Sequence, residues 1–398
     1  MTDALWFRRM VIAAAATVIL GLGWSLTVRV LTAEETVEDR LAAFDRTDVP
    51  PEQNAAEWLL AGAGAVVWSD EDFKTIGEAS NAPYADWDLT LETAVRQTLQ
   101  RQRGALETLH NGADLELSDY GIRHGAGADT ELPDLLSLVK ACRLLLAEAR
   151  VAGADGDEAA LITALATMGR LADSLEREST LITALVGVAC ERMMLRAVAE
   201  TLTAPLVLNN GLEFLDAVEG TLATEDPLAT MHRVFDAWTL VEQKALIDQS
   251  HGASAWADAG ISVADIEGAG KSLHELVDTP YGSAPARFED DPPEEPLHMV
   301  MDNVRRTIPR AQAAAAQRRL VRTGIELRRT ALADGAYPAD LSAIPDGSLP
   351  DPLTGRPFAY VVEPDGSATV AMVGAEELLE QVVVKSGAVV PPIHLPAP

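Results

Sequence analysis

Residues 10–28 form an uncharged apolar run that lies between Arg8-Arg9 and Arg29, and acidic residues follow at positions 34–39. A helix of this length rises about 28 Å, close to the thickness of the hydrocarbon core of a bilayer. Positive charge before the run and acidic charge after it predict an N-terminus in the cytoplasm. We therefore expect residues 1–33 to hold a cytoplasmic stub and one transmembrane helix of the inner (cytoplasmic) membrane, with the bulk of the chain periplasmic or extracellular.

A cleaved signal peptide is the alternative to this anchor, because Leu31-Thr32-Ala33 is a usable small-residue cleavage site. The apolar run is longer than the roughly 7 to 15 residues of a signal peptide, which favours the anchor. Either arrangement exports the protein.

The charge of the chain is strongly acidic, with 61 acidic and 31 basic residues and a formal net charge of −30. Such a chain repels a phosphate backbone almost everywhere, so nucleic acid is excluded as a partner. Because residues 1–33 carry +2 and residues 297–333 carry +6, the remaining 328 residues carry −38. The acidity therefore belongs to the exported body.

Residues 34–279 are predicted to fold as a helical bundle of about seven or eight helices. Apolar residues recur at helical spacing over 134–152, 157–177 and 180–202. The last of these is apolar almost throughout, so we expect it to lie centrally. The turn at 153–156, the cap at Asp157 and the pair Asp226-Pro227 mark helix ends and starts. Two further helical segments are predicted, at Asn54–Leu60 and at 91–109.

Residues 280–296 contain five prolines and five carboxylates, which predict an extended, solvated linker. Calcium binding by these carboxylates is an alternative that the pattern leaves open. No other cofactor is predicted.

Residues 297–333 carry eight arginines against Asp302 and Glu326 and predict a helix that restarts or kinks at Pro309. In one interpretation this helix docks on the acidic body through ion pairs. In the other it presents an anion-binding face to phosphate, an acidic glycan or another protein. The candidate interaction face consists of Arg318, Arg319, Arg322, Arg328 and Arg329.

Residues 334–398 predict a small α+β unit. Residues 358–362 and 368–373 read as strands, and Asp365-Gly366 supplies the hairpin turn. Around them lies a motif that we expect to set turns and fill a small core. Its residues are Tyr337, Pro338, Asp351, Pro352, Thr354, Gly355, Pro357 and Tyr360.

Through Gly335-Ala-Tyr337-Pro338 and Pro350-Asp351-Pro352, about 40 residues of this tail resemble the C-terminal region of type II secretion pseudopilins. In that family a helix ends at Gly-x-Tyr-Pro, a Pro-containing loop follows, and a small antiparallel sheet closes the unit. With its anchor and helical body, the chain also resembles poorly characterised exported bacterial envelope proteins. The resemblance implies a pilin-like tail and a calcium site near Glu376. The leader and the Glu of pseudopilins have no counterpart around Met10.

No catalytic or cofactor-binding residue is predicted, and the sequence leaves a metal site undecided. The seven histidines are scattered with no pair at i, i+4, and no Gly-x-Ser-x-Gly occurs. The segment from His274 to Asp278 lacks the second histidine of a zinc-protease helix.

These patterns favour a non-catalytic envelope scaffold or interaction module, held by the membrane and bound to another envelope protein. The alternatives are an exported hydrolase with its site in the helical body, and a component associated with a pseudopilus. A deep pocket lined by convergent carboxylates with shifted pKa values, or by a histidine–carboxylate pair, would favour the hydrolase.

Overall fold

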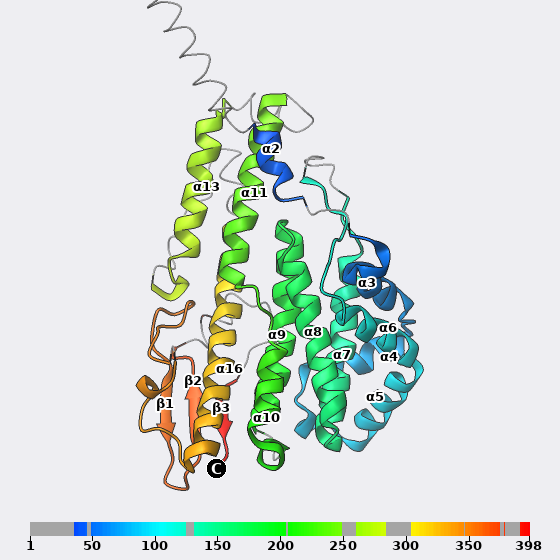
Figure 1. Cartoon of the computed structure of the whole chain (residues 1–398), viewed down its shortest axis with the longest axis vertical. Helices are drawn as coiled ribbons and strands as arrows, with labels where there is room; N and C mark the ends of the chain where they lie inside the picture. Colours follow the sequence, from blue (N-terminus) through cyan, green and yellow to red (C-terminus); the bar gives the residue numbers. More distant parts are fainter. Residues whose placement is uncertain are drawn as a thin grey trace, which may run out of the picture.

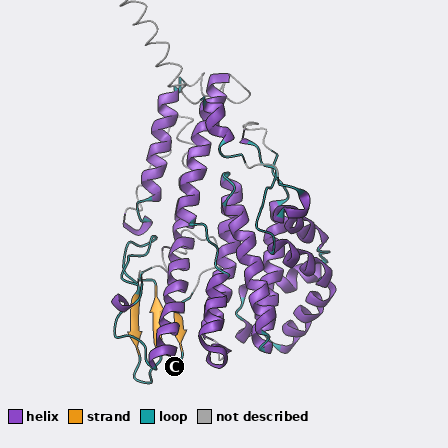
Figure 2. Cartoon of the chain, viewed as in Figure 1, coloured by secondary structure: helices purple, strands orange, loops and turns teal. Residues whose placement is uncertain are grey.

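The protein is mainly α-helical, with a small antiparallel sheet near the C-terminus (Figures 1 and 2), as predicted. Within the described part of the chain, no helix is both long and apolar enough to span a bilayer. The predicted span at 10–28 lies outside that part. The computed structural model describes residues 36–45, 49–124, 131–203, 206–248, 260–283, 304–345, 347–374, 378 and 391–398.

Four short helices gather at one side of the molecule, blue to cyan in Figure 1. They are α3 (Ala55–Ala65), α4 (Asp70–Asn81), α5 (Leu89–Arg101) and α6 (Arg103–Ala113). Polar side chains fix where they begin: the Asn54 oxygen accepts from the N–H of Ala56 at 3.1 Å, and Ser69 and Asp88 cap α4 and α5. The preceding α2 (Val37–Ala42) lies apart from them and packs on α11.

The centre of the bundle is built from α7 (Leu135–Asp155), α8 (Glu158–Glu176) and α9 (Leu181–Thr203). The side chain of Asp157 accepts from a backbone N–H group of the first turn of α8, as predicted, and Asp134 caps α7 in the same way. Helix α7 ends at Gly156, whose φ of +72° suits the left-handed position after a helix. Helix α9 contacts α7, α8, α10, α11, α16 and β3, which confirms its central position.

Four further helices complete the bundle: α10 (Leu206–Gly220, interrupted at Gly211), α11 (Pro227–Asp248), α13 (Val263–Val277) and α16 (Ile308–Asp334). Pro309 occupies the first turn of α16, where its missing N–H has no intrahelical partner to lose, so the helix restarts there as predicted. In Figure 1, α11 and α13 lie side by side and reach beyond the other helices.

The arginine-rich helix α16 joins two hydrophobic clusters. Its N-terminal half, with Ile308 and Ala313, packs in a cluster with α11 and α13. Its C-terminal half, with Leu320 and Ile325, packs in a larger cluster with α3, α6–α10 and the sheet. The apolar face of α16 is therefore buried inside the protein. The two predicted roles, internal docking and binding of an external anion, concern only its polar face.

The sheet has the order β1-β2-β3, with β1 (Ala359–Val362), β2 (Ala368–Ala371) and β3 (Ile393–Leu395) all antiparallel to their neighbours. The first two strands form the predicted hairpin, in which Gly366 adopts a φ of +82° at the turn. The third strand was not expected. Its Ile393 and Leu395 are buried against α9 and α16, because alternate residues of a strand point to one face.

Two predictions about local structure are wrong. The expected single helix over 91–109 is broken at Gln102 into α5 and α6. The predicted solvated linker is also packed at its start, where Tyr281 is buried in a short 3₁₀ turn. The reason is the buried Gln312 of α16, whose side chain accepts from the N–H of Tyr281 and donates to the carbonyl of Thr279. Residues 284–296 lie outside the described residues.

Candidate functional site

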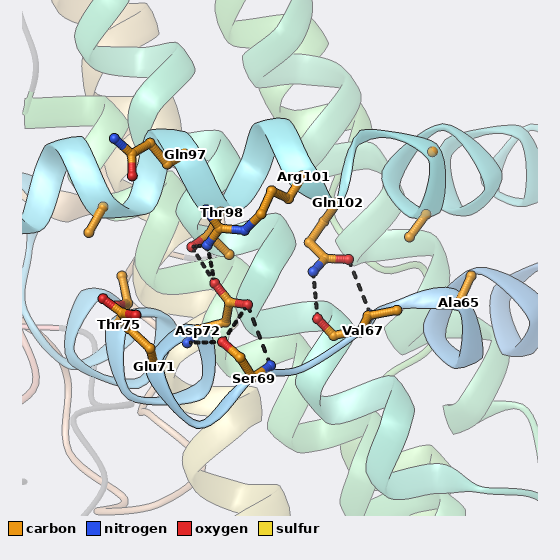
Figure 3. Close-up of a pocket in the computed structure, with 13 residues that line it drawn as sticks. Ala65, Val67, Ser69, Glu71, Asp72, Thr75, Gln97, Thr98, Arg101 and Gln102 are labelled. Atoms are coloured by element: carbon orange, nitrogen blue, oxygen red, sulfur yellow. Dashed lines mark hydrogen bonds and ion pairs between the residues drawn. The ribbon is translucent and has the colours of Figure 1, made fainter.

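A groove of about 720 Å³ lies between α4 and α5 and extends to the start of α6. Figure 3 shows Asp72 reaching from the first turn of α4 toward Thr98 and Arg101 on α5. Gln97 and Glu71 also line the space, which we call the α4–α5 groove. Its floor therefore carries both hydrogen-bond donors and acceptors.

Asp72 is the most constrained polar group of the groove. Its carboxylate accepts from the hydroxyl of Ser69 at 2.8 Å and from that of Thr98 at 2.9 Å, and it pairs with Arg101. Burial raises the pKa of Asp72, but the hydrogen bonds from Ser69, Arg101 and Thr98 outweigh it and lower the pKa below its usual value. Asp72 is thus held as an anion and joins the two helices.

Gln102 forms the end of the groove and explains the break between α5 and α6. Its amide donates to the carbonyl of Val67 at 2.7 Å and accepts from the N–H of Val67 at 3.2 Å (Figure 3). The side chain thus bonds both backbone groups of Val67, as a neighbouring strand would, in the segment between α3 and α4. Glutamine is a good helix former, so nothing in the local pattern marks this break.

Val67 lines the groove and is 76% exposed. Next to it in the chain, Trp68 meets the 48% exposed Phe73 edge to face with ring centroids 6.2 Å apart, and these two rings are not among the residues that line the groove. Aromatic and aliphatic side chains beside a polar groove are typical of surfaces that bind another protein.

Arg318, in the middle of α16, is buried among acidic groups of α8 and α9. It donates to Glu191 and to the backbone carbonyl of Glu225, and its other terminal nitrogen lies 3.4 Å from Glu176. The side chains of Glu176 and Glu191 have no exposed surface. These are the contacts that internal docking of α16 predicts.

Two carboxyl groups share this one guanidinium. Burial raises the pKa of Glu176 well above its usual value, and the neighbouring Glu191 raises it further while Arg318 opposes the change. Burial likewise raises the pKa of Glu191 against the pull of Arg318. Burial beside a single guanidinium therefore favours the protonated form of these carboxyl groups, since one cation does not balance two buried anions.

Two other arginines of the candidate face also bind inside the protein. The fully buried Arg328 donates to the hydroxyl of Tyr337 at 2.8 Å and to the carbonyl of Pro396 at 2.7 Å. It thereby ties the end of α16 to the C-terminus. Arg329 forms ion pairs with three carboxylates: Glu326, Asp216 and Glu219.

The remaining two arginines line a second cavity of about 330 Å³ between α16 and the start of α11. Arg319 donates to the carbonyl of Pro350. Arg322 is exposed, and no ion pair to it is formed among the described residues. Arg318, Glu219, Asp226 and Glu326 line the same cavity, so its surface carries both charges.

The motif of the tail is partly buried and holds its own turns. Asp351 has no exposed surface, accepts from the N–H groups of Leu353 and Thr354, and is also bonded by the Thr354 hydroxyl. Tyr360 donates to the carbonyl of Pro338 at 2.8 Å. The motif also includes Pro352 beside the second cavity, Gly355 at a φ of +70°, and Pro357, which is exposed rather than part of the core.

The predicted calcium ligands cannot be placed, because Glu376 and the carboxylates at 289–295 lie outside the described residues. Within the described ranges, no set of three or more His, Cys, Asp or Glu side chains is arranged to hold a metal ion.

Sequence reasoning missed a cluster between α11 and α13. His232 and His274 face each other across the two helices, and each also contacts an aspartate, Asp278 and Asp236 respectively. The signal was present as a repeated His-x-x-x-Asp spacing, once on each helix. The two histidines lie on different helices, so the sequence shows no histidine pair at i, i+4.

Comparison of the chain with protein families, with curated proteins and with solved structures finds no match.

Proposed function

We propose that this protein is a membrane-tethered scaffold of the bacterial envelope, whose helical body binds another envelope protein in the α4–α5 groove. The exposed Val67 at the edge of a polar groove, with the exposed Phe73 directly after Asp72 in the chain, carries this proposal. An extended segment of the partner fits these features if it places an apolar side chain against Val67 and continues over Phe73. Its backbone would then exchange hydrogen bonds with groups such as Gln97.

The tether and the location rest on the sequence. The apolar run at 10–28, with arginines before it and carboxylates after it, supports a single inner-membrane anchor and an exported body. The acidic charge of that body supports a protein rather than a nucleic acid as partner. The pilin-like character of the tail, and with it a place beside a pseudopilus, stays a proposal that rests on the Tyr337-Pro338 and Asp351-Pro352 elements.

The scaffold is favoured over the hydrolase by the positions of the acidic groups. Glu176 and Glu191, whose pKa values are raised, are fully buried beneath Arg318 and do not line the second cavity, which Arg318 borders. Asp72, which does line the groove, has a lowered pKa and is a poor general acid or base near neutral pH.

Site-specific photocrosslinking in the native membrane tests the groove. A photoreactive residue in place of Val67 should give one crosslinked protein, because this position lies at the rim. The matched control is Leu136 of α7, which is similarly exposed, at 71%. Adding Phe73→Ser should remove the product from Val67. A product that survives Phe73→Ser, or that forms equally from position 136, would contradict the proposal.

Fractionation tests the tether separately. With an epitope tag at the C-terminus, the full-length protein should remain in the membrane fraction after a high-salt wash. A soluble product shortened by about 33 residues would show cleavage after Ala33 and remove the anchor from the proposal.

A further inference from the structure

Helices α11 and α13 pack side by side and carry the same pattern in opposite directions. On α11, His232 and Asp236 are one turn apart, and on α13 the same spacing separates His274 and Asp278. Because the helices are antiparallel, each histidine lies level with the aspartate of the other helix. Figure 1 shows the two helices adjacent along their length.

The four side chains form a continuous chain of contacts. Nε2 of His232 lies 3.1 Å from Oδ1 of Asp278, and Nε2 of His274 lies 3.0 Å from Oδ1 of Asp236. The two Nδ1 atoms lie 2.5 Å apart, and the ring planes differ by 17°. The ring centroids are 4.7 Å apart, which is close to the Nδ1–Nδ1 distance plus the radius of each ring. The two rings therefore meet through their Nδ1 edges.

The N–H groups of the two neutral histidines leave no hydrogen atom between their Nδ1 atoms. A carboxylate only accepts, so each Nε2 must carry the N–H that faces its aspartate. A neutral imidazole has one N–H, so both Nδ1 atoms are then lone-pair acceptors. Two lone pairs at 2.5 Å repel each other unless a cation lies between them.

We propose that His232 and His274 bind a divalent transition metal ion such as Zn²⁺ through their Nδ1 atoms. Asp278 and Asp236 would orient the rings, as carboxylates commonly do for metal-bound histidines. With Zn–N bonds of about 2.0–2.1 Å and tetrahedral angles, the Nδ1 atoms would move apart to about 3.3 Å. Both rings lie at the surface, with about 30% of each side chain exposed, so this movement meets little resistance.

Two protein ligands imply that water fills the remaining positions, consistent with the absence of a third converging donor in the described ranges. The bound ion would fasten α13 to α11. Helix α13 packs chiefly on α11, so a crosslink at its C-terminal end would act on the contact that holds it in place.

Metal titration of the full-length chain in detergent, after removal of metal with EDTA, tests this site. Calorimetry with Zn²⁺ should give one ion per chain. That binding should be lost in His232→Ala and in His274→Ala and retained in His394→Ala, whose histidine is exposed on β3. Zn²⁺ at 100 times its Kd should raise the Tm of the wild type by about 3 °C and leave that of His274→Ala unchanged.

Co²⁺ provides an independent readout, because its visible absorption reports nitrogen ligation. The bands should form in the wild type and in His394→Ala but be absent in His274→Ala. Equal Zn²⁺ binding by His274→Ala, or no binding by the wild type, would overturn the proposal. The proposal would also be overturned if the Tm in EDTA rose at lower pH and did not respond to added metal, because a proton shared by the two histidines would then explain the contact.

Discussion

The centre of the molecule, where α16 meets α8 and α9, and its edge, where α4 meets α5, each hold an arginine against carboxylates. At the centre, the side chains of Arg318, Glu176 and Glu191 are at most 7% exposed. At the edge, Asp72 is equally buried but Arg101 is 53% exposed. The same chemistry should therefore contribute very differently to stability, because water screens only one of the two pairs.

The largest expected difference comes from removing the arginines. Arg318→Gln leaves two carboxyl groups buried without a cation and should lower the free energy of unfolding by about 3–5 kcal/mol. Arg101→Gln should cost about 1 kcal/mol, because Asp72 keeps its bonds to Ser69 and Thr98. Urea unfolding measures both, with the exposed Arg322→Gln as control. Equal losses for Arg318→Gln and Arg101→Gln would show that burial does not distinguish the two regions.

The two regions also differ in how tightly the glycines of their helices are packed. A Cβ at Gly169 of α8 would lie 1.9 Å from the carbonyl oxygen of Thr221, whereas a Cβ at Gly77 of α4 meets nothing within 4 Å. Gly169→Ala should therefore cost about 2–3 kcal/mol despite better helix propensity. Gly77→Ala should stabilise the protein by about 0.5–1 kcal/mol. Thermal unfolding of the two variants checks the signs, and a gain from Gly169→Ala would disprove the close packing of α8.

The pH dependence of stability should have opposite signs in the two regions. Burial raises the pKa of Glu176, so the folded state keeps a proton that the unfolded chain releases above about pH 4.5. Stability from this group is full below that pH and falls as pH rises, by up to about 1.4 kcal/mol per pH unit. Glu176→Gln should flatten this decline above about pH 4.5, measured by urea unfolding.

Asp72 should act at the acid end instead. Its pKa is lowered in the folded protein, so its contribution is present above about pH 3.8 and is lost as pH falls through the folded-state value. Asp72→Asn should flatten the acid side of the profile and leave the slope above pH 5 unchanged. If Asp72→Asn altered the slope above pH 5, Asp72 would not be the anion that the groove requires.

The smallest expected difference concerns helix caps, which should not distinguish the regions. Asp88 caps α5 at the edge and Asp157 caps α8 at the centre, and both are exposed. Asp88→Ala and Asp157→Ala should each cost about 1 kcal/mol, because each removes one local hydrogen bond at a helix start. Melting temperatures that differ strongly between the two would show that the caps also carry tertiary contacts.

Most helices could be predicted because their signals are local. Asp157, Asp226-Pro227 and Pro309 fix helix starts through hydrogen bonds and φ angles within one turn. The hairpin at Asp365-Gly366 was found for the same reason. The break at Gln102 was not, because it depends on the backbone of Val67, 35 residues earlier in the chain.

The candidate sites show the same division. The sequence identified the five arginines of α16, but it left open which of them would be used inside the protein. Burial of Arg318 and Arg328, and exposure of Arg322, follow from which neighbours α16 meets. The α4–α5 groove was not predicted at all, because its polar residues come from two helices and an irregular segment.

By itself, the sequence determined a mainly helical, strongly acidic body, one arginine-rich helix and a small hairpin, since periodicity, capping and charge are written in neighbouring residues. The tertiary structure alone decided which charges are buried, where β3 joins the sheet, and that His232 meets His274. These outcomes depend on contacts between residues far apart in the chain, and the energy of such contacts depends on burial, which no local pattern specifies.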